Sequence, residues 1–180
     1  MPVPNPIEWL QRMRHRRGYG VHSPFAYTLL TQVCYNPGRF YAFPRLEEKH
    51  PKSAGWFRPS ATARLRLLFR LANHRQPQLI AAPDGLTPAE QDYLHEGCLR
   101  ARITTDMPRG AADLLLLKSP RTDWARHVNE ASLLVVTDLR RNRPFWLQIT
   151  DADATRVTFD LGDIGLAFFD PGLQKQHYIA

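Results

Sequence analysis

Cysteine is scarce in this sequence, and long apolar runs are missing from it. Its 180 residues contain two cysteines, Cys34 and Cys98, which are too few for the disulfide framework of a small secreted protein. No run of about 18 apolar residues occurs, and this absence excludes a membrane-spanning helix. The N-terminal stretch MPVPNPIEWLQRMRHRR also lacks the apolar segment of a signal peptide. Together these features predict a protein of the reducing cytoplasm.

Acidic residues are rare in the first part of the chain. Residues 1–75 contain 13 Lys and Arg but only three acids, whereas residues 76–180 contain 11 basic and 14 acidic residues. A basic N-terminal region on a mildly acidic body indicates an anionic partner, an internal docking surface, or simply solvated helix faces. Arginines interleaved with Trp9 and Tyr19 would permit phosphate contacts and base stacking. The candidate contacts for RNA or another anionic partner are Arg12, Arg14, Arg16 and Arg17.

The first third of the chain is predicted to be helical. With 43% hydrophobic residues, the length suits one domain with a hydrophobic core and a small helical extension. Ser23 followed by Pro24 predicts a capped helix that runs through Val33. Helices are also predicted over residues 6–17 and 44–50, and a longer amphipathic helix over about 60–74. We expect residues 1–58 to form an N-terminal helical extension.

After residue 76 the pattern changes to short apolar runs separated by helical or turn segments. Runs at 79–82, 101–105, 113–117 and 132–137 predict strands, and the last two are apolar enough to be buried on both faces of a parallel sheet. Helices are predicted over 88–97, over 122–129 with Thr122 as the cap, and over 144–149. These alternating elements predict an α/β, Rossmann-like fold with a mostly parallel sheet.

The C-terminal part has a different pattern. Segments 156–161 and 164–169 are joined by Gly162-Asp163, which predicts an antiparallel hairpin. Residues 174–179 could extend the edge of the sheet. The predicted sheet is therefore mostly parallel but closes with an antiparallel pair.

The stretch QLIAAPDGLTPAEQDYL at 78–94 is the predicted centre of the fold. A strand is stopped by Pro83-Asp84-Gly85, and Thr87, Pro88 and Glu90 then form the signature of a capped helix start. A strand, a tight turn and a helix N-terminus present backbone N–H groups to a ligand at the crevice of a doubly wound sheet. The turn lacks the glycine spacing that allows a nucleotide cofactor to approach the backbone. The sequence thus indicates the scaffold more strongly than an activity.

Three features of the sequence together resemble a known family. They are RRGYGVHSPFAYTLL at 16–30 with FYAFPRLEE at 40–48, a long helix followed by Gln76-Pro77 and an apolar strand, and VTFDLGDIGLAFFD with LQKQHYIA at the C-terminus. They resemble bacterial class I S-adenosylmethionine-dependent methyltransferases, in which the cofactor loop follows the first strand. The resemblance implies that residues 59–180 form a shortened Rossmann-like domain of the methyltransferase type and that S-adenosylmethionine is the possible cofactor.

The resemblance also implies a set of site residues. The implied cofactor-binding residues are Ala82, Asp84, Gly85, Thr87 and Asp106, and the implied substrate or lid residues are Tyr19, His22, Phe25 and Asp138. The segment from 79 to 113 is too short for two strand–helix units, so Asp106 could follow either the second or the third strand of the family's sheet. For residues 19, 22 and 25, docking of the extension on the sheet is the alternative to a lid.

The cofactor motif departs from the family pattern. After its first strand the family usually carries an acidic residue and a glycine-bearing loop. The corresponding positions here are occupied by Ala81, Ala82, Pro83 and Asp84, and Pro83 removes a backbone donor. Lys118 stands where relatives carry an acidic residue. We therefore expect an eroded, weakly active or inactive methyltransferase; the alternative is a non-enzymatic binding or scaffold protein that binds RNA, an anionic surface or a partner protein.

No metal site is expected from the sequence. Asp138 alone supplies too few oxygen ligands for a divalent cation. His95 and Cys98 have half of a zinc pattern, but no second pair with suitable spacing accompanies them.

Overall fold

The computed structural model describes residues 21–51 and 59–180. The helix predicted over residues 6–17, the residue Tyr19 and the four arginines at positions 12, 14, 16 and 17 lie outside these ranges. The predictions made for them stay predictions.

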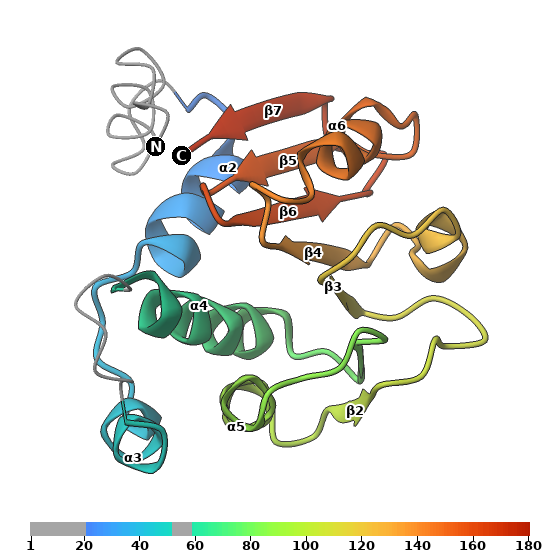
Figure 1. The fold of residues 1–180 in the computed structure, drawn as a ribbon. Coiled ribbons are helices and arrows are strands. Elements are labelled where there is room, and N and C mark those ends of the chain that lie inside the picture. Colours follow the sequence, from blue (N-terminus) through green and yellow to red (C-terminus); the bar gives the residue numbers. More distant parts are fainter. Residues whose placement is uncertain (1–20, 52–58) are drawn as a thin grey trace.

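In the described part of the chain, the strands form one seven-stranded sheet with the order β2-β1-β3-β4-β6-β5-β7 (Figure 1). The strands are β1 (Leu79–Ala81), β2 (Arg102–Thr104), β3 (Leu114–Leu117), β4 (Leu133–Thr137), β5 (Val157–Asp160), β6 (Ile164–Phe168) and β7 (Gln176–Ile179). Strands β1 to β4 pair in parallel, and β6 runs antiparallel to both β4 and β5. The predicted α/β fold with a closing hairpin is confirmed, and β7 extends the edge by pairing in parallel with β5.

The helices follow the predicted positions with one exception. They are α2 (Pro24–Thr28), the π-helical η1 (Leu29–Cys34), α3 (Ala42–Lys49), α4 (Pro59–Arg75), α5 (Pro88–Gly97), the 3₁₀ turn η2 (Trp124–His127) and α6 (Arg143–Asp151). Ser23 caps α2 as predicted, its hydroxyl accepting from the N–H of Ala26 at 3.3 Å. The cap predicted at Thr122 is wrong. Asp123 precedes η2 and makes no capping hydrogen bond, and the segment forms a short turn that buries Trp124 against Phe169.

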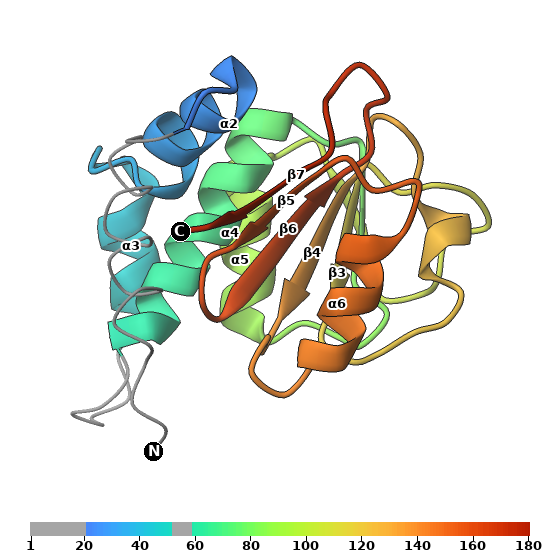
Figure 2. The same cartoon turned by 90° about the horizontal axis from the view of Figure 1, so that it is seen from above.

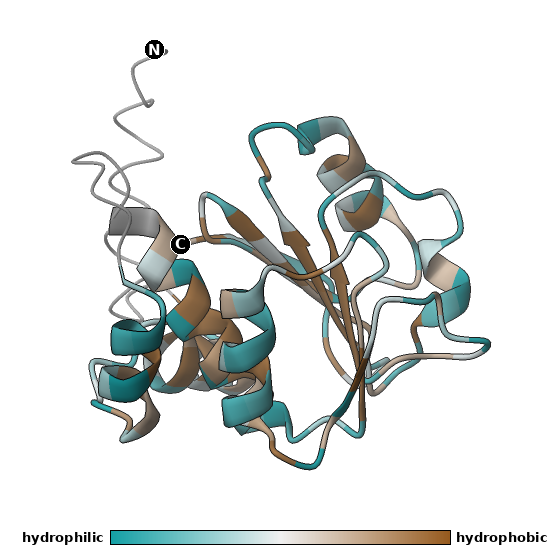
Figure 3. Ribbon diagram, turned by 60° about the horizontal axis from the view of Figure 1, so that its bottom comes forward, coloured by the Kyte–Doolittle hydropathy of each residue, from teal (hydrophilic) through white to brown (hydrophobic). Residues whose placement is uncertain are grey.

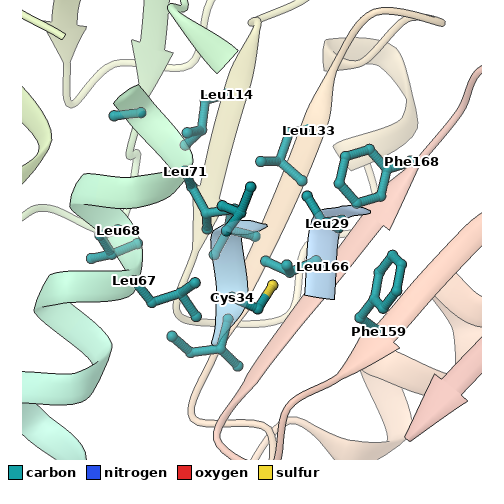
Figure 4. Close-up of a cluster of buried hydrophobic side chains, with 14 of the residues drawn as sticks. Leu29, Cys34, Leu67, Leu68, Leu71, Leu114, Leu133, Phe159, Leu166 and Phe168 are labelled. Atoms are coloured by element: carbon teal, nitrogen blue, oxygen red, sulfur yellow. The ribbon is translucent and has the colours of Figure 1, made fainter. Parts of the chain in front are cut away.

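Helices cover both faces of the sheet (Figure 2). On one face, η1 and α4 pack against strand residues in the larger core cluster, part of which is shown in Figure 4; on the other, Trp146 of α6 and Trp124 of η2 pack in a second cluster. Successive residues of β3 alternate between these two clusters, because neighbouring side chains of a strand point to opposite faces. Strand β3 is therefore apolar along its whole length, and Figure 3 shows hydrophobic strands in the middle of the sheet.

The described part of the helical extension shares the core of the sheet. Phe25 of α2 meets Phe168 of β6 edge to face at a centroid distance of 5.0 Å. Helix α3 packs through Phe43 against Phe69 of α4 and Tyr93 of α5. Exposed ion pairs surround this contact; one joins Arg45 to Glu96 at 2.5 Å. The extension is docked by packing, with surface charges adding little.

The strand order reverses between β1 and β3. From β1 the chain passes through α5 to β2 on one side and then returns to β3 on the other side of β1. The connection from β2 to β3 contains no helix or strand, so the unit absent from the sequence spacing is the third strand with its helix. Asp106 therefore follows the second strand. In open α/β sheets, ligands bind at the carboxyl ends of the strands where the order reverses, which here is the crevice between the ends of β1 and β3.

A close contact between β6 and α6 fixes the layer on the second face. Gly165 of β6 lies under the ring of Trp146, and a Cβ atom built at Gly165 would be 2.6 Å from Cζ3 of that ring. Trp146 is fully buried. Only glycine allows the indole to approach the strand this closely.

We expect Gly165→Ala to lower the free energy of unfolding by about 1–3 kcal/mol, because the added methyl group forces the buried indole from its position. The matched control is Gly110→Ala, since a Cβ at Gly110 meets no atom within 4 Å. Urea unfolding followed by circular dichroism measures both variants. Equal stability of the two alanine variants would show that the contact does not constrain the fold.

Candidate functional site

The crevice between β1 and β3 is bordered by two short loops. After β1, residues 82–85 form a tight turn in which the N–H of Gly85 donates to the carbonyl of Ala82 at 2.9 Å. Gly85 has a φ of 79°, which glycine adopts without strain. The chain leaves β3 through Lys118 and Ser119. A cofactor at this crevice would have to lie against these residues.

The carboxylate of Asp84 connects the two loops directly. Its Oδ2 accepts from the backbone N–H groups of Lys118 at 2.8 Å and Ser119 at 3.0 Å, and its Oδ1 accepts from the hydroxyl of Ser119 at 2.8 Å. Hydrogen bonds to an ionised acceptor are stronger than neutral ones. Asp84, which the sequence places in the cofactor loop, therefore holds the end of β1 to the end of β3.

An ion pair lies beside this bridge. Nζ of Lys118 is 2.6 Å from Oε2 of Glu90, whose side chain is only 3% exposed. The same carboxylate oxygen accepts from the N–H of Thr87 at 2.8 Å. Burial alone would raise the pKa of Glu90, but the hydrogen bonds from Lys118 and Thr87 outweigh it and hold that pKa below its usual value. Lys118 thus neutralises a buried glutamate.

The N-terminus of α5 is closed by its own residues. The hydroxyl of Thr87 accepts from the N–H of Glu90 at 3.2 Å, which completes the capping box that the sequence predicts. The N–H of Gln91 donates to the carbonyl of Thr87, and Pro88 has no N–H. The expectation that this helix end presents bare N–H groups to a ligand is therefore wrong for Glu90, because the cap takes up its donor; the N–H of Gln91 makes the first hydrogen bond within the helix.

The loop that follows β4 is also part of this hydrogen-bond network. The buried side-chain amide of Asn142 donates to the carbonyls of Lys118 and Thr137, both at 2.9 Å. Asp138 adopts a left-handed φ of 53°, and its carbonyl accepts from the N–H of Asn142. The loops after β1, β3 and β4 are thus fixed to one another by hydrogen bonds. Spacing in the sequence gives no signal for Asn142, because it reaches a carbonyl 24 residues away.

The structure brings together some of the implied cofactor residues. Asp84 and Thr87 belong to the network, Ala82 is fully buried and Gly85 ends the turn. Asp106 instead lies beside a different cavity of about 440 Å³ along β2. The walls of that cavity include Arg102, Thr104 and Arg109 but none of the four other implied residues.

The implied substrate or lid residues are dispersed. His22 is exposed, Phe25 packs against Phe168, and Asp138 has its Oδ1 3.6 Å from Nη1 of Arg64. The packing of Phe25 favours docking of the extension over a lid.

The residues at the crevice do not fit S-adenosylmethionine. Its methionine part carries an ammonium and a carboxylate, which require a free acidic group and free donors. Asp84 already accepts three hydrogen bonds, Glu90 is paired with Lys118, and Pro83 offers no N–H. The polar groups of Asp84, Glu90, Lys118 and Ser119 at this place are engaged with each other.

Metal ligands and membrane-spanning helices are also absent from the described residues. Within 21–51 and 59–180, no three side chains of His, Cys, Asp or Glu are grouped so as to hold a metal ion. None of the helices in the same ranges is both long and apolar enough to cross a membrane.

Comparison with known proteins relates the fold to methyltransferases. No protein-family model and no curated protein matches the chain. Among solved structures, a methyltransferase from Geobacter sulfurreducens aligns with a TM-score of 0.52 and 15% sequence identity, over 75% of this chain and 92% of that one. At this identity the similarity concerns the fold alone. The chain has a Rossmann-like, methyltransferase-like fold.

Removing the cation of the buried pair is expected to destabilise the protein strongly. Lys118→Met leaves Glu90 as an uncompensated buried charge, and we expect a loss of about 3–5 kcal/mol, most of which Glu90→Gln in the same chain restores. Lys49→Met is the control, because it removes an exposed pair with Asp92 and should cost no more than about 1 kcal/mol. Urea unfolding measures all variants. Additive effects of the two crevice substitutions would contradict this account.

The ion pair between Lys118 and Glu90 also predicts that the free energy of unfolding decreases at acidic pH. Because the folded-state pKa of Glu90 lies below its ordinary value of 4.5, this carboxylate stabilises the fold above that value and loses its effect as pH falls through the lowered pKa. Urea unfolding between about pH 3 and pH 6 should therefore give a steeper loss for the wild type than for Glu90→Gln. Parallel curves for the two proteins would exclude this role of Glu90.

Proposed function

We propose that this protein is a non-enzymatic binding protein built on a methyltransferase fold. The observation that carries the proposal is the network in which Asp84 joins the loops after β1 and β3 while Lys118 neutralises Glu90. It takes up the polar groups that a methyl donor would need at the crevice. A protein with this arrangement keeps the frame of a methyltransferase without the site that supplies the reactive group.

The energy of the network argues against a weakly active enzyme. Removing one partner of a buried ion pair costs about 3–5 kcal/mol, and a ligand that displaced Lys118 would leave Glu90 uncompensated in the same way. Since each 1.4 kcal/mol is about a factor of ten in affinity, a ligand that opened the crevice would bind at least about a hundredfold more weakly than in an open site. A methyl donor with a dissociation constant of about 1 μM in an open site would then bind with one of about 0.1 mM or weaker.

The partner of such a protein is not a methyl-group acceptor. The RNA or anionic partner that the arginines at 12, 14, 16 and 17 indicate stays a prediction, because these residues lie outside the described ranges. Within those ranges, exposed arginines such as Arg140 and Arg141 follow β4 without a side-chain partner. They add positive charge at the carboxyl edge of the sheet and favour an anionic partner.

Isothermal titration of the full chain with S-adenosylmethionine and S-adenosylhomocysteine tests the proposal. We expect no saturable binding below about 0.1 mM, since binding must break the network. The matched variant is Asp84→Ala, which removes the bridge. Micromolar binding by the wild type that Asp84→Ala abolishes would overturn the proposal and assign Asp84 to a working cofactor site.

A further inference from the structure

A cavity of about 380 Å³ lies away from the crevice, between α4, the end of η1 and the turn that joins β5 to β6. Its walls are formed by Cys34, Tyr35, Asn36, Ala63, Arg64, Leu67, Arg70, Leu161, Asp163 and Ile164. The volume falls within the range of about 300–1,000 Å³ that is typical of small-molecule sites. The walls contain none of the residues that form the Asp84 network, so the two places can be tested separately.

Arg64 reaches this cavity without a hydrogen bond to the described residues. Its Nη1 lies 3.6 Å from Oδ1 of Asp138 and 3.8 Å from Oδ2 of Asp163, which are ion-pair distances beyond hydrogen-bond reach. Its Nε is buried and has no partner in the part of the chain that the structure describes. A buried donor without an acceptor is unfavourable. The Arg64 side chain as a whole is 26% exposed, so a ligand in the cavity can reach the rest of its guanidinium.

Arg70 presents a second donor of the same kind. One end of its guanidinium donates to the carbonyl of Cys34 at 2.7 Å, which holds the side chain against η1. Its Nε is buried and, like that of Arg64, has no partner among residues 21–51 and 59–180. Both arginines come from α4, so one rigid helix orients them.

The other walls do not satisfy these donors. Burial raises the pKa of the Cys34 thiol to about 12, so this group is neutral near pH 7 and gives the arginines no counter-charge. The carboxylates of Asp138 and Asp163 are more than 40% exposed and remain hydrated. Cys34 and Asp163 of the wall, and Asp138 outside it, therefore leave both Nε donors without an acceptor, while Leu67, Leu161 and Ile164 supply an apolar surface.

We propose that this cavity binds a small molecule with an apolar body and one carboxylate or phosphate group, which lies against Arg64 and Arg70. The anionic group lies against the accessible part of the Arg64 guanidinium, since this side chain is 26% exposed, and the body covers the apolar wall. The site is separate from the methyl-donor crevice and does not depend on the proposed function.

Titration calorimetry of the full chain with three probes of similar shape tests this. The probes are 2-naphthoate, 2-naphthyl phosphate and the neutral 2-naphthamide. We expect at least one anion to bind at least about tenfold more tightly than the amide, and the tighter anion identifies the class of ligand. Equal binding of all three, or no binding of either anion at about 5 mM, would overturn the proposal.

Variants locate the binding. Arg64→Gln should weaken the anion at least about tenfold and leave the amide unchanged. The control Arg126→Gln, which removes an exposed arginine on η2 across the sheet, should change neither. An equal loss in both variants would show that only general surface charge attracts the anion.

A second variant keeps the test valid if Arg64→Gln fails to fold. Ala63 lines the cavity but is exposed, so Ala63→Trp can fill the space without disturbing the core. We expect this variant to keep the thermal unfolding temperature and to abolish binding of the anion. Undiminished binding by a folded Ala63→Trp protein would place the anion elsewhere and overturn the assignment.

Discussion

The hydrogen bonds from Asp84 to the loop after β3 are the constraint on which the functional region depends. Strands β1 and β3 lie side by side, with Ala81 paired to Leu115, so the loops that follow them meet at the same edge of the sheet. In a nucleotide-binding α/β protein, a ligand separates such loops. Here a carboxylate crosses between them, and the backbone N–H groups of Lys118 and Ser119 point at protein instead of ligand.

The rest of the network follows from this contact. With Lys118 held at the end of β3, its ammonium group meets Glu90 on the first turn of α5, and the glutamate in turn closes the helix cap at Thr87. Asn142 adds the loop after β4. Buried charges and amides are tolerated because each has a partner, and a ligand that displaced one of them would leave the others unsatisfied.

The crevice and the cavity beside α4 differ in this respect. At the crevice the polar groups are matched to each other, whereas in the cavity beside α4 the guanidinium groups of Arg64 and Arg70 keep buried donors without acceptors. One fold can carry different functions at different sites. The docked extension contributes to this second region, because Cys34, at the end of η1, forms part of its wall.

Most of the secondary structure was predicted from the sequence, but one local pattern led to a wrong prediction. The apolar run that became β4 and the capped start of α5 were predicted because period and cap chemistry act over a few residues. Thr122 was misassigned as a cap, since burial of Trp124 against Phe169 shaped that segment. Asp106 could not be assigned to a strand from spacing alone. The edge position of β2, which only pairing reveals, decided it.

The sequence by itself determined the α/β class, the closing hairpin and the departures at Pro83 and Lys118 from a methyltransferase pattern. It also supplied the capping box of Thr87 and Glu90, because those residues are three positions apart. Only the tertiary structure decided that Asp84 meets a loop 34 residues away, that Lys118 pairs with Glu90, and that Arg64 faces a cavity. The physical reason is that local propensity fixes elements, whereas the partner of a polar side chain depends on which strands become neighbours.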